Sequence, residues 1–203
     1  MKFINCFALF ICLFLYACGG NDNDQLSRLE SDSIILAFGD SLTHGTGAKQ
    51  NESYPAILEQ LTGRKVINAG IPGEISEKGL TRLPGLLEKH HPGLLILCHG
   101  GNDILRKQDA KKMGSNIEVM IKLAQSQNIP VILLGVPQFG IFLSPAEIYS
   151  EIADKTGVIY IGDLVSDILG DNSLKSDTVH PNKDGYRKMA EQIYIVMQKA
   201  GAI

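Results

Sequence analysis

Ser41 is placed where a side chain could act as a nucleophile. It follows Gly39-Asp40 at the end of an apolar run, residues 33–38, so its hydroxyl is expected at the tip of a turn. The run has no charged residue, which is typical of a strand buried on both faces of a parallel sheet. The carboxyl edge of such a strand is where open α/β sheets bind their ligands. Ser41 is therefore a candidate nucleophile, although Gly-Asp-Ser also forms ordinary turns with a capping serine.

His180 and Asp177 could supply the base that a nucleophilic serine needs. Histidine is the usual base, because its ordinary pKa of about 6.5 lies near working pH. His180 lies in a turn-rich segment, residues 176–182, just before the last expected helix. Asp177 precedes it by three residues, and in a tight loop this spacing lets a carboxylate hold the imidazole Nδ1–H. The alternative is a surface loop in which His180-Pro181 only starts a helix.

The other four histidines are weaker candidates. His44 lies in the segment just beyond Ser41 and is the second candidate base. His90 and His91 end an expected helix, where a cation suits the helix dipole, so we expect them to face solvent. His99 directly follows an apolar strand, and we expect a structural role for it.

The pattern of apolar segments predicts an α/β fold. Strands are expected at residues 33–38, 66–67, 94–98, 131–134 and 158–161, and helices at residues 54–61, 76–90, 115–127, 144–155 and 183–200. This alternation indicates a parallel sheet with helices on both faces. Its strands would all end at one edge. Ser41, Gly73 and Asn102 follow the first three strands, so we expect them to converge there.

Composition limits the classes of partner. The chain has 203 residues, of which 44% are hydrophobic, and its net charge is −3. This length suits one α/β domain, and the charge gives no basic footprint for nucleic acid. Cys98 lies inside an apolar strand and is expected to be a small core residue rather than half of a disulfide.

The first residues have the pattern of an export signal. Residues 1–17 combine Lys2 with a long apolar stretch, which indicates a signal peptide. Leu15-Tyr16-Ala17-Cys18 resembles a bacterial lipobox, in which Cys18 would become the lipidated first residue. The alternative is a plain secretory signal cut near Ala17. Residues 18–32 have the composition of a flexible spacer, and residues 33–203 form the expected domain.

Four ordered sequence blocks resemble those of the SGNH (GDSL) hydrolase family. They are Gly39-Asp40-Ser41-Leu42, Gly73, Gly100-Gly101-Asn102-Asp103 and Asp177-Thr178-Val179-His180-Pro181. The likeness is greatest to the bacterial exported thioesterase/lysophospholipase/arylesterase branch, from which Pro72 and Glu74 depart.

The resemblance implies a three-layer α/β/α flavodoxin-like fold and a hydrolase that uses neither a metal nor a cofactor. It implies that Ser41 attacks the acyl carbon, that His180 is the base and that Asp177 orients His180. It further implies that the N–H groups of Ser41 and Gly73 and the amide of Asn102 form the oxyanion hole. Asp40 and Asp103 are expected to brace the loops.

We therefore expect a serine esterase acting on lysophospholipids, fatty acyl thioesters or aryl esters. The alternatives are a carbohydrate O-acetyl esterase on the same fold, or a non-catalytic lipoprotein that binds lipid or glycan. We expect a monomer that is exported and lipid-anchored to the bacterial cell envelope. The alternative location is periplasmic or secreted.

Overall fold

The computed structural model describes residues 25–138 and 143–203. The expected signal peptide, residues 1–17, and the expected lipidation site Cys18 lie outside the described residues. So does the first part of the expected spacer, up to residue 24.

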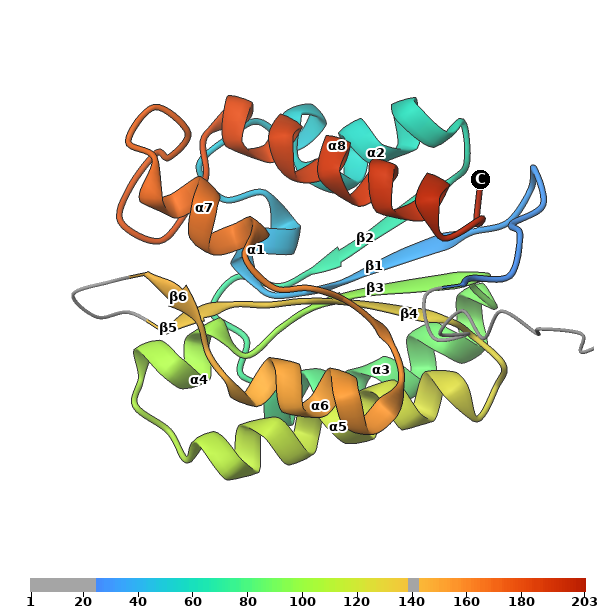
Figure 1. The fold of residues 1–203 in the computed structure, drawn as a ribbon, viewed down its shortest axis with the longest axis horizontal. Helices are drawn as coiled ribbons and strands as arrows, with labels where there is room; N and C mark the ends of the chain where they lie inside the picture. Colours follow the sequence, from blue (N-terminus) through green and yellow to red (C-terminus); the bar gives the residue numbers. More distant parts are fainter. Residues whose placement is uncertain (1–24, 139–142) are drawn as a thin grey trace, which may run out of the picture.

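The core of the fold is a five-stranded parallel sheet (Figure 1). Its strands are β1 (Ile35–Gly39), β2 (Val66–Gly70), β3 (Leu94–Cys98), β4 (Val131–Leu134) and β7 (Ile159–Ile161). Their order across the sheet is β2-β1-β3-β4-β7, which is the flavodoxin-like order. The predicted α/β class with five parallel strands is confirmed.

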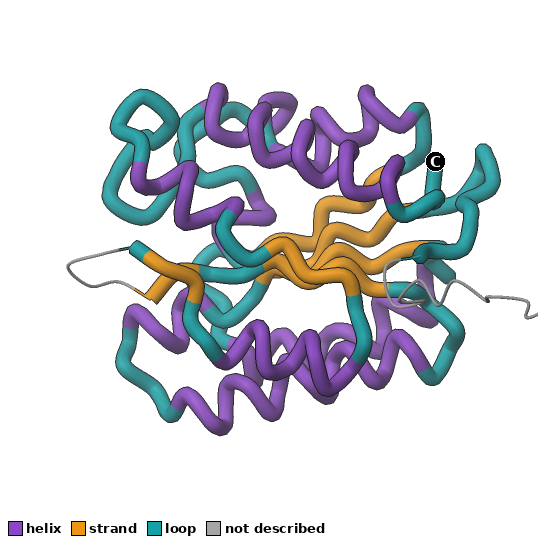
Figure 2. Tube along the Cα trace, viewed as in Figure 1, coloured by secondary structure: helices purple, strands orange, loops and turns teal. Residues whose placement is uncertain are grey.

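Helices cover both faces of this sheet, giving three layers (Figures 1 and 2). They are α1 (Ser41–His44), α2 (Tyr54–Thr62), α3 (Ser76–His90), α4 (Gly101–Leu105), α5 (Ala110–Gln125), α6 (Ile148–Thr156), α7 (Leu164–Gly170) and α8 (Lys183–Lys199), with the 3₁₀ helix η2 (Gln50–Glu52). The helices α2, α7 and α8 lie on one face, and α3, α5 and α6 lie on the other. The short helices α1 and α4 follow β1 and β3 directly, at the carboxyl edge of the sheet.

The central strands are buried because helices shield them on both sides. Every residue of β1 and β3 is buried, and the side chains of Leu36, Phe38 and Leu95 are fully inaccessible to solvent. Full burial of one such side chain contributes about 1.5–3 kcal/mol. The carboxyl ends of β1 and β3 are therefore fixed. From β1 the chain continues to β2 on one side, and β3 lies on the other side, so the gap between β1 and β3 is the switch point of the sheet.

The helix predicted at residues 144–155 is wrong at its start. Ser144–Pro145 forms a short strand, β6, paired antiparallel with β5 (Pro137–Gln138), and the helix begins only at Ile148. A residue before proline is driven to extended backbone, which favours a strand at Ser144. The backbone N–H of Ala146 then donates to Val136 and continues the hairpin.

The spacer predicted at residues 18–32 is shorter than expected. Within its described part, the N–H groups of Leu26 and Leu29 donate to the carbonyls of Ala200 and Ala202, each at 2.8 Å. Leu29 is only 5% exposed and belongs to the core. The packed domain therefore begins near Leu26 and includes a contact with the end of the chain.

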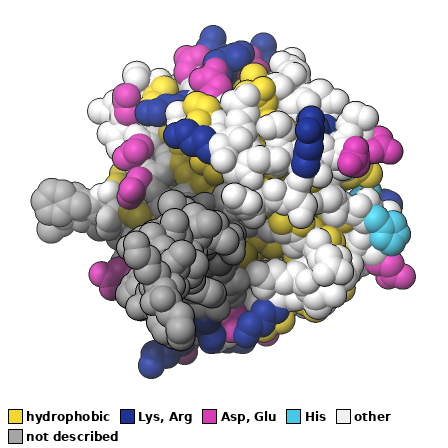
Figure 3. Space-filling view, turned by 45° about the vertical axis from the view of Figure 1, so that its right-hand side comes forward, with side chains coloured by type: hydrophobic (Ala, Val, Ile, Leu, Met, Phe, Trp, Pro, Cys, Tyr) yellow, Lys and Arg dark blue, Asp and Glu magenta, His cyan; other side chains and the backbone are white. Residues whose placement is uncertain are grey.

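Basic and acidic side chains are scattered singly or in small groups over the part of the surface that Figure 3 shows in colour. Among the described residues, the helices are all too short or too polar to cross a lipid bilayer.

Gly39 at the end of β1 is required for close packing rather than for a bend. A Cβ at this position would lie 2.0 Å from the carbonyl oxygen of Cys98 and 2.3 Å from Oγ1 of Thr43. The φ angle of Gly39 is not positive, so a left-handed backbone conformation is not the reason for glycine at this position. The glycine lets β1, β3 and α1 meet directly beneath Ser41.

Gly39→Ala should lower the free energy of unfolding by about 1–3 kcal/mol, because the new methyl group displaces backbone atoms of a packed strand. Gly85→Ala is the matched control, since Gly85 lies on the exposed side of α3 with nothing within 4 Å of an added Cβ. The free energy of unfolding of the control should rise by about 0.5–1 kcal/mol. Urea unfolding followed by circular dichroism measures both, and equal stabilities would contradict the packing argument.

Candidate active site

Ser41 is the first residue of α1 and lies at the carboxyl edge of β1. The preceding residue, Asp40, caps this helix, with Oδ1 accepting a hydrogen bond of 3.1 Å from the N–H of Leu42. The carbonyl of Ser41 accepts from the N–H groups of Gly45 and Thr46, both at 3.1 Å. These bonds fix the backbone on both sides of the serine hydroxyl.

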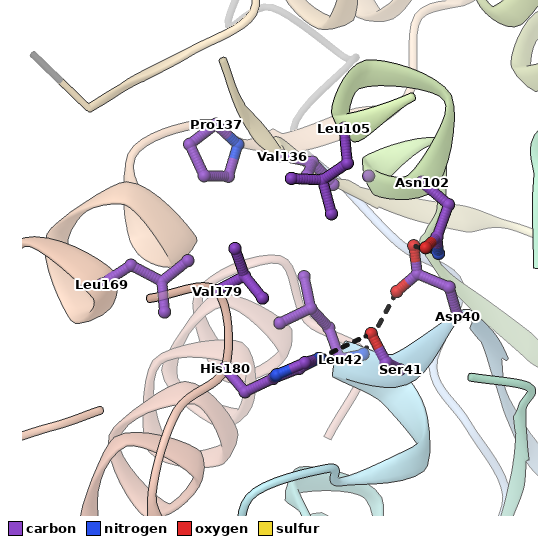
Figure 4. A pocket seen from close by; sticks show the side chains of 11 residues that line it. Asp40, Ser41, Leu42, Asn102, Leu105, Val136, Pro137, Leu169, Val179 and His180 are labelled. Atoms are coloured by element: carbon purple, nitrogen blue, oxygen red, sulfur yellow. Dashed lines mark hydrogen bonds between the residues drawn. The ribbon is translucent and has the colours of Figure 1, made fainter. Parts of the chain in front are cut away.

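His180 reaches Ser41 from the loop between α7 and α8 (Figure 4). The distance from Nε2 of His180 to Oγ of Ser41 is 3.0 Å. On the other side of the ring, Nδ1 lies 2.8 Å from Oδ2 and 3.1 Å from Oδ1 of Asp177. Because a carboxylate only accepts, we assign the ring hydrogen to Nδ1, which leaves Nε2 free to accept the serine hydroxyl.

Asp177 is held in its charged form although it is half exposed. Partial burial raises the pKa of this carboxyl, but the hydrogen bond from His180 and the backbone N–H groups of Val179 and His180 outweigh it. The pKa of Asp177 therefore lies below its ordinary value of 3.8. At neutral pH the group facing Nδ1 of His180 is a carboxylate.

Asn102 comes from α4 and lies on the same cavity as Ser41 and His180. Its Nδ2 donates to the backbone carbonyl of Glu74 at 3.1 Å and, more weakly, to Oδ2 of Asp40 at 3.3 Å. Gly73 is the residue before Glu74, and its carbonyl accepts a hydrogen bond from Arg106. Gly73 itself does not line the cavity as the described residues form it.

Asp40 and Asp103 are buried carboxylates that brace the site. Burial raises the pKa of Asp40, and the hydrogen bond from the backbone N–H of Leu42 opposes this only in part. Asp103 accepts from the backbone N–H of Ser76 at 2.8 Å and from its hydroxyl at 2.6 Å, which ties α4 to the start of α3. Neither carboxylate contacts Ser41 or the ring of His180 through a hydrogen bond.

The cavity beside Ser41 is small, about 20 Å³, and its walls are mostly apolar. The apolar lining consists of Leu42, Leu105, Val136, Pro137, Leu169 and Val179. Val136 and Pro137 were missed from the sequence, although both follow β4 and the rule that ligands bind at the carboxyl edge of the sheet could have identified them. Leu169 belongs to α7, a helix that the sequence pattern did not predict.

The rings of His44 and His99 make no hydrogen bond to the hydroxyl of Ser41. His44 ends α1 and is partly buried against β2, where its Nδ1 has no hydrogen-bond partner among the described residues. His99 is fully buried and bonds to Glu74 through Nε2 at 3.2 Å. Across residues 25–138 and 143–203, groups of three or more His, Cys, Asp or Glu side chains arranged to hold a metal ion are absent.

The comparisons with known proteins agree with this fold. A family model described as the GDSL-like lipase/acylhydrolase family matches residues 37–188. The chain is 30% identical over 173 residues to an arylesterase of Vibrio mimicus, covering 80% of this chain and 86% of that protein. It is 27% identical over 172 residues to thioesterase 1/protease 1/lysophospholipase L1 of Escherichia coli strain K12, covering 81% and 83%.

A solved structure is similar along the same length. The psychrotrophic esterase EstA from a Pseudoalteromonas species matches with a TM-score of 0.74 and 28% identity, covering 83% of this chain and 98% of that one. Fold and relatives together define a carboxylic ester hydrolase. The chain belongs to the GDSL-like lipase/acylhydrolase family, the SGNH hydrolases, as its four sequence blocks predicted.

Proposed function

We propose that this esterase works through a catalytic triad of Ser41, His180 and Asp177. The observation that carries the proposal is the 3.0 Å contact between Oγ of Ser41 and Nε2 of His180, made by residues 139 positions apart. A hydroxyl at this distance can pass its proton to the imidazole as it attacks an acyl carbon. Asp177 then faces the imidazolium that forms and stabilises its charge.

The reaction follows from these roles in two stages. Attack by Oγ of Ser41 on the acyl carbon forms a tetrahedral oxyanion, and His180 takes the serine proton. His180 then gives that proton to the departing alcohol or thiol, which leaves an acyl group on Ser41. In the second stage, His180 takes a proton from water, the resulting hydroxide attacks the acyl carbon, and the acid leaves as the proton returns to Ser41.

The oxyanion would be stabilised by the N–H groups of Ser41 and Gly73 and by the amide of Asn102. One hydrogen of this amide is held by the carbonyl of Glu74 at 3.1 Å. The other donates to Oδ2 of Asp40 at 3.3 Å, and this longer bond is the one that the amide would exchange for a bond to the oxyanion. One donor of this kind contributes about 100- to 1000-fold in rate.

The shape of the site bears on the substrate. The cavity beside Ser41 is small enough to favour a short acyl group, which keeps carbohydrate O-acetyl esters as the second candidate. Leu105, however, also lines a larger groove of about 850 Å³ between α4, α5, β6 and α6. A longer acyl chain would leave the cavity past Leu105 and lie in this groove, as acyl thioesters and lysophospholipids require.

We also propose that the enzyme is exported and attached to the cell envelope through a lipid on Cys18, and that it is a monomer. Leu15-Tyr16-Ala17-Cys18 and the polar residues that follow support the anchor. Two acyl chains on one cysteine give stable membrane attachment, whereas one chain gives only marginal binding.

Ser41→Ala should reduce hydrolysis of p-nitrophenyl acetate by at least about 10³-fold, because no other group replaces the nucleophile. An alkyl phosphonate ester should modify the wild-type protein once, at Ser41, and leave the variant unmodified by mass spectrometry. Ser126→Ala is the control, since its exposed hydroxyl bonds only to its own helix at the carbonyl of Leu123. Phosphonylation at another residue would overturn the assignment.

Leu105→Arg should discriminate against long acyl chains, because a buried methylene contributes about 0.8 kcal/mol and the charged side chain removes apolar contacts. We expect kcat/KM for p-nitrophenyl octanoate to fall about tenfold, with that for the acetate ester nearly unchanged. Leu105 is 47% exposed, so the fold should survive, and Leu61→Arg on α2, 36% exposed, is the matched control. An equal loss for both esters would show that Leu105 acts in the cavity beside Ser41, which both esters occupy, and not on the longer chain.

Cys18→Ser should leave the protein without lipid and move it from the membrane fraction to the soluble fraction or to uncleaved precursor. Esterase activity in detergent extracts should stay the same. Cys12→Ser, inside the expected signal peptide, is the control and should keep the lipid. An N-terminal peptide with an unmodified Cys18 in the wild-type protein, found by mass spectrometry, would contradict the anchor.

A further inference from the structure

The carboxylate of Glu74 is buried in the loop between β2 and α3 and is held on both sides. Its side chain is only 8% exposed. Nε of Arg82 donates to Oε1 at 3.1 Å, and Nη2 donates to Oε2 at 2.6 Å. Nε2 of His99 lies 3.2 Å from the same Oε2. Such a carboxylate has one orientation, fixed by a cation from α3 and a ring from the end of β3.

His99 has a single tautomer in this arrangement. Its Nδ1 accepts the backbone N–H of Gly100 at 2.9 Å, so we assign the ring hydrogen to Nε2, where it donates to Glu74. The ring is fully buried and packs against Phe38, with 5.7 Å between ring centroids. The carbonyl of His99 accepts from the hydroxyl of Tyr149 at 2.7 Å. His99 therefore cannot turn away from Glu74 without breaking buried contacts.

The helix α3 is shaped to admit this ring. A Cβ on Gly79 would lie 2.4 Å from Nε2 of His99, so α3 can approach the ring only with glycine at this position. Arg82, one turn further along, also donates to the carbonyl of Ala69 at 3.0 Å and lies 4.3 Å above the ring of Phe38. The ion pair is thus integrated with α3 and with the ends of β1 and β2.

This cluster lies directly behind the expected oxyanion donors. The backbone carbonyl of Glu74 accepts one hydrogen of the Asn102 amide, and Gly73 is the residue before Glu74. His99 precedes Asn102 by three residues and holds the N–H of Gly100. The contact between Glu74 and His99 therefore joins the loop that carries Gly73 to the loop that carries Asn102.

We propose that Glu74, held by His99 and Arg82, is a positioning residue that sets the distance and direction of the Gly73 and Asn102 donors. It touches neither substrate nor Ser41 and acts through the two donors. The inference rests on the proposed function, in which these groups stabilise the oxyanion. The usual alternative for a buried ion pair is a role in stability alone.

Glu74→Gln keeps the shape of the side chain but places an N–H₂ group against donors from Arg82 and His99. We expect kcat to fall about tenfold with KM changed less than twofold, because misaligned oxyanion donors weaken only the transition state. Burial raises the pKa of Glu74, but His99 and Arg82 outweigh it and hold the pKa below its ordinary value of 4.5. Assays at neutral pH therefore compare a carboxylate with an amide.

The matched control is Glu77→Gln, the same chemical change three residues further along the chain, in the first turn of α3. Glu77 is exposed and pairs only with Lys112, at 3.2 Å, so its kcat should equal that of the wild type. His99→Leu is the second variant, because it removes the hydrogen bond to Glu74 and leaves the pair with Arg82 intact. It should lower kcat by a similar factor even if Glu74→Gln proves too unstable to purify.

A boronic acid that forms a tetrahedral adduct on the serine separates positioning from stability. Its inhibition constant should rise by the same factor as kcat/KM falls in Glu74→Gln and His99→Leu. Folded variants with a lower melting temperature but unchanged kcat and boronic acid affinity would overturn the inference and leave the proposed function standing.

The last measurement combines Glu74→Gln with Asn102→Ala. Asn102→Ala alone should lower kcat by about 100-fold, and adding Glu74→Gln should then cost less than it does in the wild type, since one donor that it positions is gone. A full, additive loss would mean that Glu74 acts elsewhere, which overturns the inference. An Asn102→Ala protein with wild-type kcat would overturn the oxyanion assignment in the proposed function, and this inference with it.

Discussion

The hydrogen bond between Ser41 and His180 is the contact that the rest of the structure has to maintain. Its partners come from opposite ends of the domain, so its 3.0 Å length depends on how two loops are tied together. The hydroxyl of Tyr186, on α8, donates to the carbonyl of Thr46 in the serine loop at 2.8 Å. The N–H of Thr46 in turn donates to the carbonyl of Ser41. The helix that follows the histidine is thereby bonded to the loop that follows the serine.

The pKa values of Asp40 and Asp177 are shifted in opposite directions, and this separates the roles of the two carboxyl groups. Burial raises the pKa of Asp40, whose oxygens accept from backbone and amide N–H groups. The bonds from His180 and two backbone N–H groups lower the pKa of Asp177, despite its partial burial. Asp177 keeps its negative charge beside the ring of His180, where the proposed mechanism forms an imidazolium. Asp40 instead supports the backbone next to Ser41. Environment, not residue type, distinguishes them.

The sequence pattern predicted the buried strands and the longer helices well and the short helices poorly. The bounds of β3, β4 and α3 agree with the prediction, because each is a continuous apolar run or a helix of several turns. The helices α1, α4 and α7 have only four, five and seven residues, too few to show a helical period, and none was predicted. The helix α5 begins at Ala110 rather than at residue 115, because Asp109 caps a first turn that is rich in lysine.

Some residues of the site could be predicted from the sequence, and others could not. Ser41 and Asn102 lie just beyond the ends of β1 and β3, and His180 and Asp177 share one loop, so topology and spacing predicted where these residues would lie. Their chemical roles were implied by the resemblance to the family. The contact between Glu74 and His99 joins side chains 25 residues apart, and neither residue carries a periodic signal that points to the other.

Gly79 is the one residue in the sequence that indicates the position of His99 against α3. Glycine inside a helix costs about 1 kcal/mol relative to alanine, so Gly79, the fourth residue of α3, contradicts the local preference. The structure supplies the reason, since only glycine leaves room for the ring of His99. Gly85 in the same helix has open space around it, so a glycine alone does not reveal which kind of position it marks. Residues that break a local rule are where tertiary contacts outweigh propensity, and here that contact lies behind the proposed oxyanion donors.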